Sequence, residues 1–134
     1  MKNYQIIVVL LLLAGCSSAP VIYNPSVVEE ASLAKVTVEH SKNYNAWIQF
    51  VYNSEDIEVT KRGGWDNLLS EITLEPGTYR FKVRCAGVRG EAYPEVTAKL
   101  DASKEYSAYC SISKGKNLLG MTIDAYAEVI IKEI

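Results

Sequence analysis

The chain has 134 residues, 49% of them hydrophobic and 22% charged, and its formal net charge is −2. This length suits one domain with a sizeable hydrophobic core. Because nucleic-acid binding depends on basic side chains that neutralise phosphates, a slightly acidic chain without a basic block argues against a nucleic-acid partner.

The first segment, residues 1–15, has the pattern of a secretory signal peptide. Lys2 supplies a positive charge, and an unbroken aliphatic run follows from Ile6 to Leu13. The run fits the roughly 7–15-residue apolar core of a signal peptide and is shorter than the about 20 residues that span a bilayer. We expect residues 1–15 to be cleaved. The alternative, a buried N-terminal helix or strand, would need partners on every face.

Residues Leu13-Ala14-Gly15-Cys16 resemble the bacterial lipobox, in which a leucine and two small residues precede a cysteine. The resemblance implies that diacylglycerol is attached to the Cys16 sulfur and that cleavage follows Gly15. Two or more acyl chains make a stable anchor, because each buried methylene contributes about 0.8 kcal/mol. In bacteria with two membranes, aspartate after the cysteine resembles an inner-membrane retention signal. Ser17 does not, so we expect the periplasmic face of the outer membrane.

Residues 16–30 are predicted to be a lipidated, flexible tether. Serine, proline and asparagine are frequent there, and apolar periodicity is weak. The alternative for part of this segment is an edge strand through Val21-Ile22-Tyr23.

Residues 31–134 alternate between apolar and polar side chains with a period of two, which predicts β-strands. The segments with this pattern are 36–39, 46–53, 57–60, 69–74, 79–85, 96–100, 106–113 and 123–131. Glycine-, proline- and asparagine-containing turns separate them, and no segment has the pattern of a long helix. We therefore predict a single all-β domain, an antiparallel β-sandwich of seven to eight strands.

Cys85 and Cys110 are predicted to form a disulfide. They remain as an even pair in a chain exported to an oxidising compartment, and the alternation places both on inward strand faces. The alternative is a metal site, but two thiolates with His40 far away in the sequence lack the close ligand spacing of zinc sites. No metal site and no cofactor are predicted.

Two segments, Leu74–Val83 and Val96–Tyr106, resemble strand-and-turn units of small extracytoplasmic β-sandwiches. Over about Leu74–Ser113, the chain is similar to carboxypeptidase-regulatory-like domains and to related lipoproteins with a domain of unknown function. The resemblance implies strand and turn geometry and carries no functional residues. It leads us to expect a positive φ at Gly77, and it puts Ser103 where glycine is usual in such a turn.

No catalytic residues are predicted. The single histidine, His40, leaves almost nothing from which to build a Ser-His-Asp triad. Glu55, Asp56 and Glu58 lack the glycine and the six-oxygen pattern of a calcium loop, so we interpret them as a solvated acidic turn. An enzyme is the least expected class of function.

Arg62, Trp65 and Arg89 are the predicted partner-binding residues. They lie in glycine-rich turns, loops on a rigid β scaffold are common recognition sites, and Trp and Arg often dominate interfaces. The alternative is the outward strand face that carries Arg80, Lys82 and Arg84.

These features favour a non-catalytic binding or structural module of the cell envelope, held on a membrane through Cys16. Its expected partner is an envelope protein or peptidoglycan. The alternative is an inhibitor of a periplasmic enzyme such as lysozyme, with residues 63–65 or 86–90 entering the enzyme's cleft.

Overall fold

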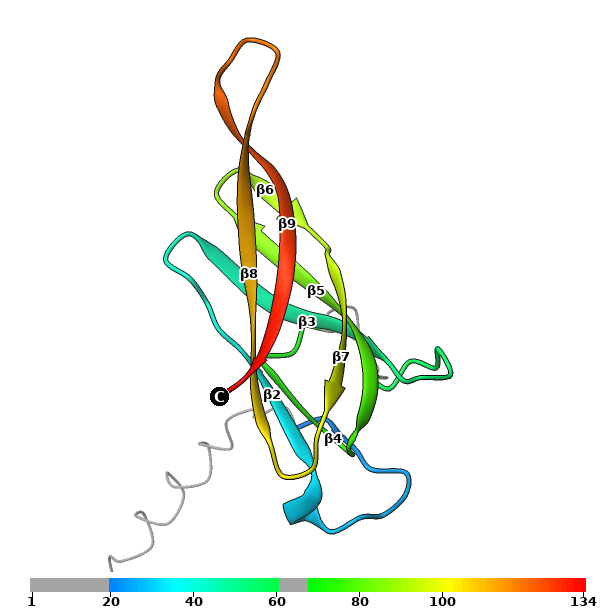
Figure 1. The fold of residues 1–134 in the computed structure, drawn as a ribbon. Helices are drawn as coiled ribbons and strands as arrows, with labels where there is room; N and C mark the ends of the chain where they lie inside the picture. The colour runs from blue at the N-terminus through cyan, green and yellow to red at the C-terminus, as the bar shows by residue number, and fades with distance from the viewer. Residues whose placement is uncertain (1–19, 61–67) are drawn as a thin grey trace, which may run out of the picture.

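The computed structural model describes residues 20–60 and 68–134, and the described chain is built from strands (Figure 1). The elements are β1 (Ile22–Tyr23), the 3-10 helix η1 (Glu30–Ser32), β2 (Ala34–Val38), β3 (Tyr44–Tyr52), β4 (Glu71–Leu74), β5 (Gly77–Gly87), β6 (Gly90–Ala92), β7 (Glu95–Leu100), β8 (Glu105–Lys116) and β9 (Thr122–Glu133). The described residues contain no α-helix, so the prediction of an all-β domain is confirmed.

The strands form two sheets. One has the order β1-β4-β2-β8-β9, and the other has the order β3-β5-β6 with β7 also paired to β5. Two pairs, β1 with β4 and β2 with β8, are parallel, which differs from the predicted antiparallel arrangement. Apolar and polar residues that alternate with a period of two indicate which face of a strand is buried. They do not indicate whether the neighbouring strand runs parallel or antiparallel. The very short strands β1 and β6 bring the number of described strands to nine, above the predicted seven to eight.

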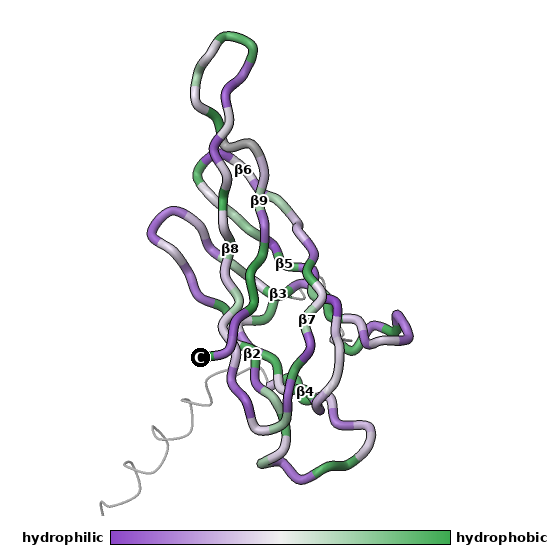
Figure 2. Tube along the Cα trace, in the orientation of Figure 1, coloured by the Kyte–Doolittle hydropathy of each residue, from purple (hydrophilic) through white to green (hydrophobic). Residues whose placement is uncertain are grey.

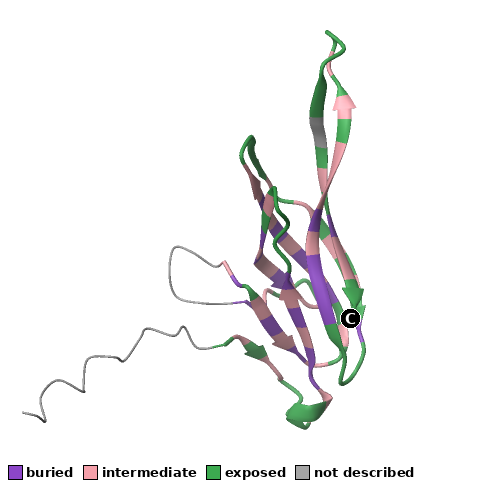
Figure 3. Ribbon diagram, turned by 90° about the vertical axis from the view of Figure 1, so that its left-hand side faces the viewer, coloured by how far each residue is buried: buried purple, intermediate pink, exposed green. Residues whose placement is uncertain are grey.

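Residues of both sheets form one hydrophobic core. The buried positions lie along the strands of both sheets (Figure 3). The largest fully buried side chains are Phe81, Ile48, Ile72, Leu74, Leu100, Val36, Val51, Val83, Thr60 and Ser107. Burial of an apolar side chain of this size contributes about 1.5–3 kcal/mol. The alternation predicted for the middle of β5 is confirmed, because Tyr79, Phe81, Val83 and Cys85 are all buried.

The inward face of β3 changes partway along the strand. The sequence predicts that Phe50 and Tyr52 point into the core together with Ile48. The pairing of β3 with β5 shifts register between Ile48 and Phe50, and Val51 is the buried residue beyond that point. A β-bulge inserts one extra residue and so reverses the inside and outside positions that follow it.

The predicted strand at 57–60 is an extended loop that touches β3. An isolated bridge joins Tyr52 and Glu58, and the hydroxyl of buried Thr60 accepts a hydrogen bond from the Val51 amide at 3.4 Å. This loop covers part of the free edge of β3.

Residues 20–30 lie against the sheet at its β1 edge. Ile22 and Tyr23 pair with Thr73 and Leu74 of β4, which is the edge strand considered as the alternative to a tether. The Tyr23 ring meets the Tyr79 ring edge to face at 6.4 Å. The chain is therefore docked from Val21 onward, whereas the predicted tether extends to residue 30.

Two turn residues differ from simple expectation. Gly77 does not take a positive φ, and a Cβ there would lie at an ordinary contact distance of 3.4 Å from the Tyr79 ring. Ser103 has a φ of 61°, the left-handed conformation for which glycine is usual, and its hydroxyl donates a hydrogen bond to the Ala31 carbonyl at 2.6 Å.

Candidate functional site

Three turns lie at one end of the domain, which we call the apical end: residues 39–43, residues 88–89 and residues 117–121 (Figure 1). The pairing of Tyr44 with Gly87 places the first two turns side by side. The third turn closes the β8–β9 hairpin, which projects past the ends of the other strands (Figure 1). Loops on a rigid scaffold are the usual place of recognition in β-proteins.

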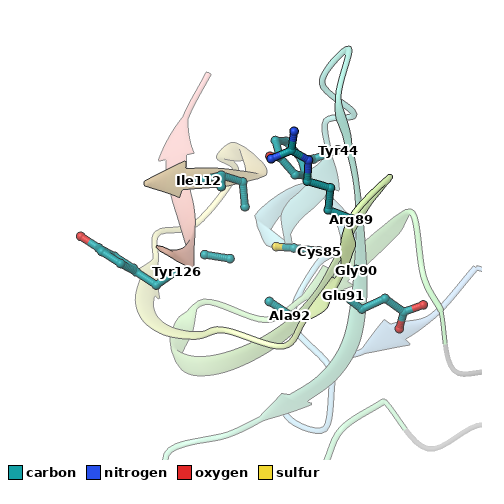
Figure 4. Close-up of a pocket in the computed structure, with 9 residues that line it drawn as sticks. Tyr44, Cys85, Arg89, Gly90, Glu91, Ala92, Ile112 and Tyr126 are labelled. Carbon is teal, nitrogen blue, oxygen red and sulfur yellow. The ribbon is translucent and has the colours of Figure 1, made fainter. Parts of the chain in front are cut away.

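A pocket of about 260 Å³ opens between the two sheets at the apical end. Its lining residues are Tyr44, Cys85, Arg89, Gly90, Glu91, Ala92, Ile112, Tyr126 and Ala127. Ile112, Cys85 and Ala92 face the hollow, while the polar tips of Glu91 and Tyr126 point away from it (Figure 4). The floor of this apical pocket is therefore apolar and its rim is polar.

The disulfide forms part of that floor. Cys85 of β5 and Cys110 of β8 are bonded, with their Cα atoms 5.9 Å apart, and the bond connects one sheet to the other. The predicted disulfide is thus confirmed. It fixes the separation of the sheets next to the pocket.

Arg89 lies at the pocket rim with an exposed side chain. Within 20–60 and 68–134 its guanidinium has no ion-pair partner. The nearby carboxylate of Glu91 accepts hydrogen bonds from the Arg84 guanidinium and, at 2.6 Å, from the Tyr93 hydroxyl. These hydrogen bonds lower the pKa of Glu91 to about 2. Arg89 is therefore available to an acidic ligand.

The alternative binding face on β5 is largely neutralised. Arg80 binds Asp56 and also Glu95 at 2.7 Å, and its guanidinium stacks 4.3 Å above the Tyr52 ring. Arg84 binds Glu91. Two of the three cations on the strand face already have carboxylate partners, which makes this face a weaker candidate than the apical end.

The tip of the β8–β9 hairpin includes hydrophobic residues (Figure 2), and their side chains are exposed. Leu118 is fully exposed, Leu119 is 82% exposed and Met121 is 55% exposed. The turn is ordered: the Asn117 side chain accepts hydrogen bonds from the Leu119 and Met121 amides, both at 3.0 Å. The sequence predicts a break between strands at residues 114–117 and gives no role to the apolar side chains that follow it. The signal was an apolar run inside a turn, where polar residues are the rule.

The remaining predicted site residues are distributed as follows. Arg62, Trp65 and the predicted lipidation residue Cys16 lie outside the described residues. His40 is exposed; its Nδ1 accepts a hydrogen bond from the Ala46 amide at 3.3 Å, and its ring packs on Trp47.

Among the residues described, histidine, cysteine, aspartate and glutamate side chains form no cluster of three or more that would hold a metal ion. The same part of the chain contains no helix with the length and apolar character needed to cross a bilayer. No family model, no curated protein and no solved structure matches this chain.

Proposed function

We propose that this protein is a non-catalytic binding module of the bacterial cell envelope, a β-sandwich held by lipid on Cys16 at the periplasmic face of the outer membrane. The observation that carries the proposal is the apical pocket, which combines an apolar floor with the exposed Arg89 at its rim. An envelope protein or peptidoglycan is the expected class of partner.

The pocket is suited to one apolar group with an acidic group beside it. Binding sites are commonly concave and apolar, with a few polar side chains that orient the ligand. Arginine binds carboxylates through two parallel hydrogen bonds and is frequent among residues that dominate interfaces. A partner side chain on the floor between Ile112 and Ala92 would place a neighbouring carboxylate near Arg89.

The test is a crosslinking pull-down from intact envelopes with Arg89→Ser. We expect at least a tenfold loss of captured partner, after circular dichroism has confirmed folding. Lys99→Ser is the matched control, since Lys99 is an exposed cation on β7 away from the pocket. Equal recovery with both variants would remove Arg89 from the interface. Trp65→Ala is the corresponding test for the residue predicted from sequence alone.

The anchor is tested separately with Cys16→Ser. Because the cysteine sulfur carries the diacylglycerol in the lipobox resemblance, the variant should take up no radiolabelled palmitate and should remain unprocessed or soluble. Palmitate that still enters the Cys16→Ser protein would contradict the proposed anchor.

A second candidate function is inhibition of a periplasmic enzyme such as lysozyme. The projecting β8–β9 hairpin favours it, because a narrow ordered loop can enter an active-site cleft. The discriminating measurement is the lytic rate of lysozyme with excess protein. Inhibition that is lost in Leu119→Ser would support this function, and an unchanged rate would exclude lysozyme as the target.

A further inference from the structure

The β-bulge in β3 brings three aromatic side chains to the outer face of that strand. Trp47 points outward, because its neighbours Ala46 and Ile48 are buried. The register shift after Ile48 turns Phe50 and Tyr52 to the same outer face, whereas an unbroken strand would point them into the core. We call these three residues the aromatic row. It is about 15 Å long at about 3.3 Å per residue.

The rings of the aromatic row are half-buried, and each contacts a neighbouring ring or cation. The His40 ring lies 4.9 Å from the Trp47 ring, and the Phe50 and Tyr52 rings are 6.3 Å apart. The Arg80 guanidinium lies 4.3 Å from the centre of the Tyr52 ring. Because these contacts restrict the side-chain rotamers, the rings lose little conformational entropy when a ligand packs on them.

The charged side chains beside the aromatic row are already paired. β5 places one basic side chain opposite each ring of the row: Arg84, Lys82 and Arg80. The Arg80 guanidinium binds Asp56 and Glu95, and the Arg84 guanidinium binds Glu91. Lys82 lies opposite Glu95 in the pairing of β5 with β7. The described part of this face therefore offers hydrogen-bonding groups that are held in place and little unpaired charge.

Paired charges disfavour a charged ligand, because such a ligand would have to separate the existing ion pairs. Nucleic acid in particular needs free cations that neutralise its phosphates. The paired groups can still form further hydrogen bonds, since a guanidinium has five N–H donors and a carboxylate has about four lone-pair sites. This chemistry suits the hydroxyl and amide groups of an uncharged polar ligand.

The aromatic row adds a second requirement on that ligand. The face of an aromatic ring is negative, so it attracts C–H groups that carry a small positive charge. The C–H groups of a sugar are of this kind, because their carbon atoms are bonded to oxygen. They lie on the faces of the sugar ring, while the hydroxyl groups lie around its perimeter. A row of aromatic rings beside fixed hydrogen-bonding groups therefore matches a linear glycan.

We propose that the outer face of β3 and β5 binds an uncharged glycan chain that runs along the aromatic row. This site is separate from the apical pocket. The paired charges that weaken the face for an acidic partner are the ones that suit it to a glycan. In the proposed envelope location the glycan is the sugar backbone of peptidoglycan, and only this choice of source rests on the proposed function.

The test is direct binding of the full lipoprotein, solubilised in detergent, to purified peptidoglycan sacculi and to a neutral oligomer of β-linked N-acetylglucosamine. We expect both to bind. Trp47→Ala and Tyr52→Ala should each weaken binding at least tenfold, after circular dichroism has confirmed folding. Tyr109→Ala is the matched control, because Tyr109 is a half-buried tyrosine on the outer face of the other sheet.

Two further measurements do not depend on the alanine variants. In a Trp65→Phe background, Trp47 is the single tryptophan, and its fluorescence emission should shift when the oligomer is added. Oligomer binding should also change by less than about threefold in 1 M sodium chloride, where the Debye length is about 3 Å.

Several outcomes would overturn the proposal: an oligomer that does not bind, wild-type binding by both alanine variants, an unchanged Trp47 emission, or binding that is lost in salt. Binding to the stem peptides of peptidoglycan in place of the sugar oligomer would overturn it as well. Arg89→Ser should bind the oligomer normally. If Arg89→Ser loses the oligomer while Trp47→Ala retains it, the glycan binds in the apical pocket, so the binding function stands and the strand-face proposal fails.

Discussion

Tyr79 makes the free energy of unfolding depend on pH in the alkaline range. Its hydroxyl donates to the Glu75 carbonyl at 2.9 Å, and burial raises its pKa to about 12 from an ordinary value of 10.0. Between these values the folded protein keeps the proton and the unfolded chain releases it, so a rise in pH favours unfolding. We predict that the free energy of unfolding falls between pH 10 and about pH 12, by at most about 3 kcal/mol.

Urea titrations across that pH window measure the effect. The control is Tyr79→Phe, which loses the hydrogen bond to Glu75 at a cost of about 1 kcal/mol at neutral pH. Its free energy of unfolding should fall less steeply above pH 10. Parallel curves for the two proteins would show that Tyr79 is not the group responsible.

Gly87 controls the position of a ring at the pocket rim. A Cβ added there would lie 2.6 Å from two ring carbons of Tyr44, so Gly87→Ala must displace that ring. We predict a loss of stability of about 1–3 kcal/mol from overpacking and a clear loss of partner capture. Gly77→Ala is the matched control, because its Cβ would be at an ordinary 3.4 Å from Tyr79. Full partner capture by Gly87→Ala would exclude Tyr44 and the rim beside it from binding.

The disulfide joins strand β5 of one sheet to strand β8 of the other. It closes a loop with a sequence separation of 25, for which about 3 kcal/mol of stabilisation is expected. We predict that Cys85→Ala with Cys110→Ala lowers the free energy of unfolding by that amount and leaves the β-sheet circular dichroism spectrum unchanged. The reason is that the core beyond the bridge, including Phe81 and Ile48, remains buried. A double variant that is unfolded at room temperature would contradict this account.

Strand faces were the features that sequence predicted well. In β5 the alternation of Tyr79, Phe81 and Val83 with polar neighbours fixes the buried face, because one side of the strand meets the core along most of its length. In β3 the same reasoning is wrong after Ile48, since a bulge has no signature in apolar periodicity. The parallel pairing of β2 with β8 could not be predicted from the sequence either, because it depends on contacts between segments far apart in the chain.

The candidate site was only partly predictable, because it also depends on contacts between segments that are distant in the sequence. Arg89 was selected by residue type and by its glycine-rich turn, and the structure places it at a pocket rim. The pocket itself is formed by five strands and a turn, so no local sequence pattern indicates it. The sequence analysis assigned no role to the hairpin residues Leu118 and Leu119, because only the fold shows that they are exposed.

At the scale of the whole molecule, the docked segment from Val21 and the β8–β9 hairpin tip lie at opposite ends (Figure 1). Together with the proposed anchor on Cys16, this predicts an upright orientation on the membrane. A fluorophore introduced as an unnatural amino acid at Val27 should transfer energy efficiently to an acceptor on lipid headgroups in a nanodisc. The same fluorophore at Leu118, about 40 Å farther away by strand rise, should transfer weakly. Equal transfer from the two positions would mean that the domain lies flat on the membrane.

The parallel pairing of β2 with β8 also affects how the chain reaches its native state. Lys35 must find Glu105, about 70 residues later, before the central strands of that sheet are complete. Pairings between distant segments slow folding, because loop-closure entropy is lost before the contacts form. A polypeptide exported as we propose has to cross a membrane while still unfolded. The late position of β8 delays folding until most of the chain has been synthesised, which gives a translocation machinery time to act.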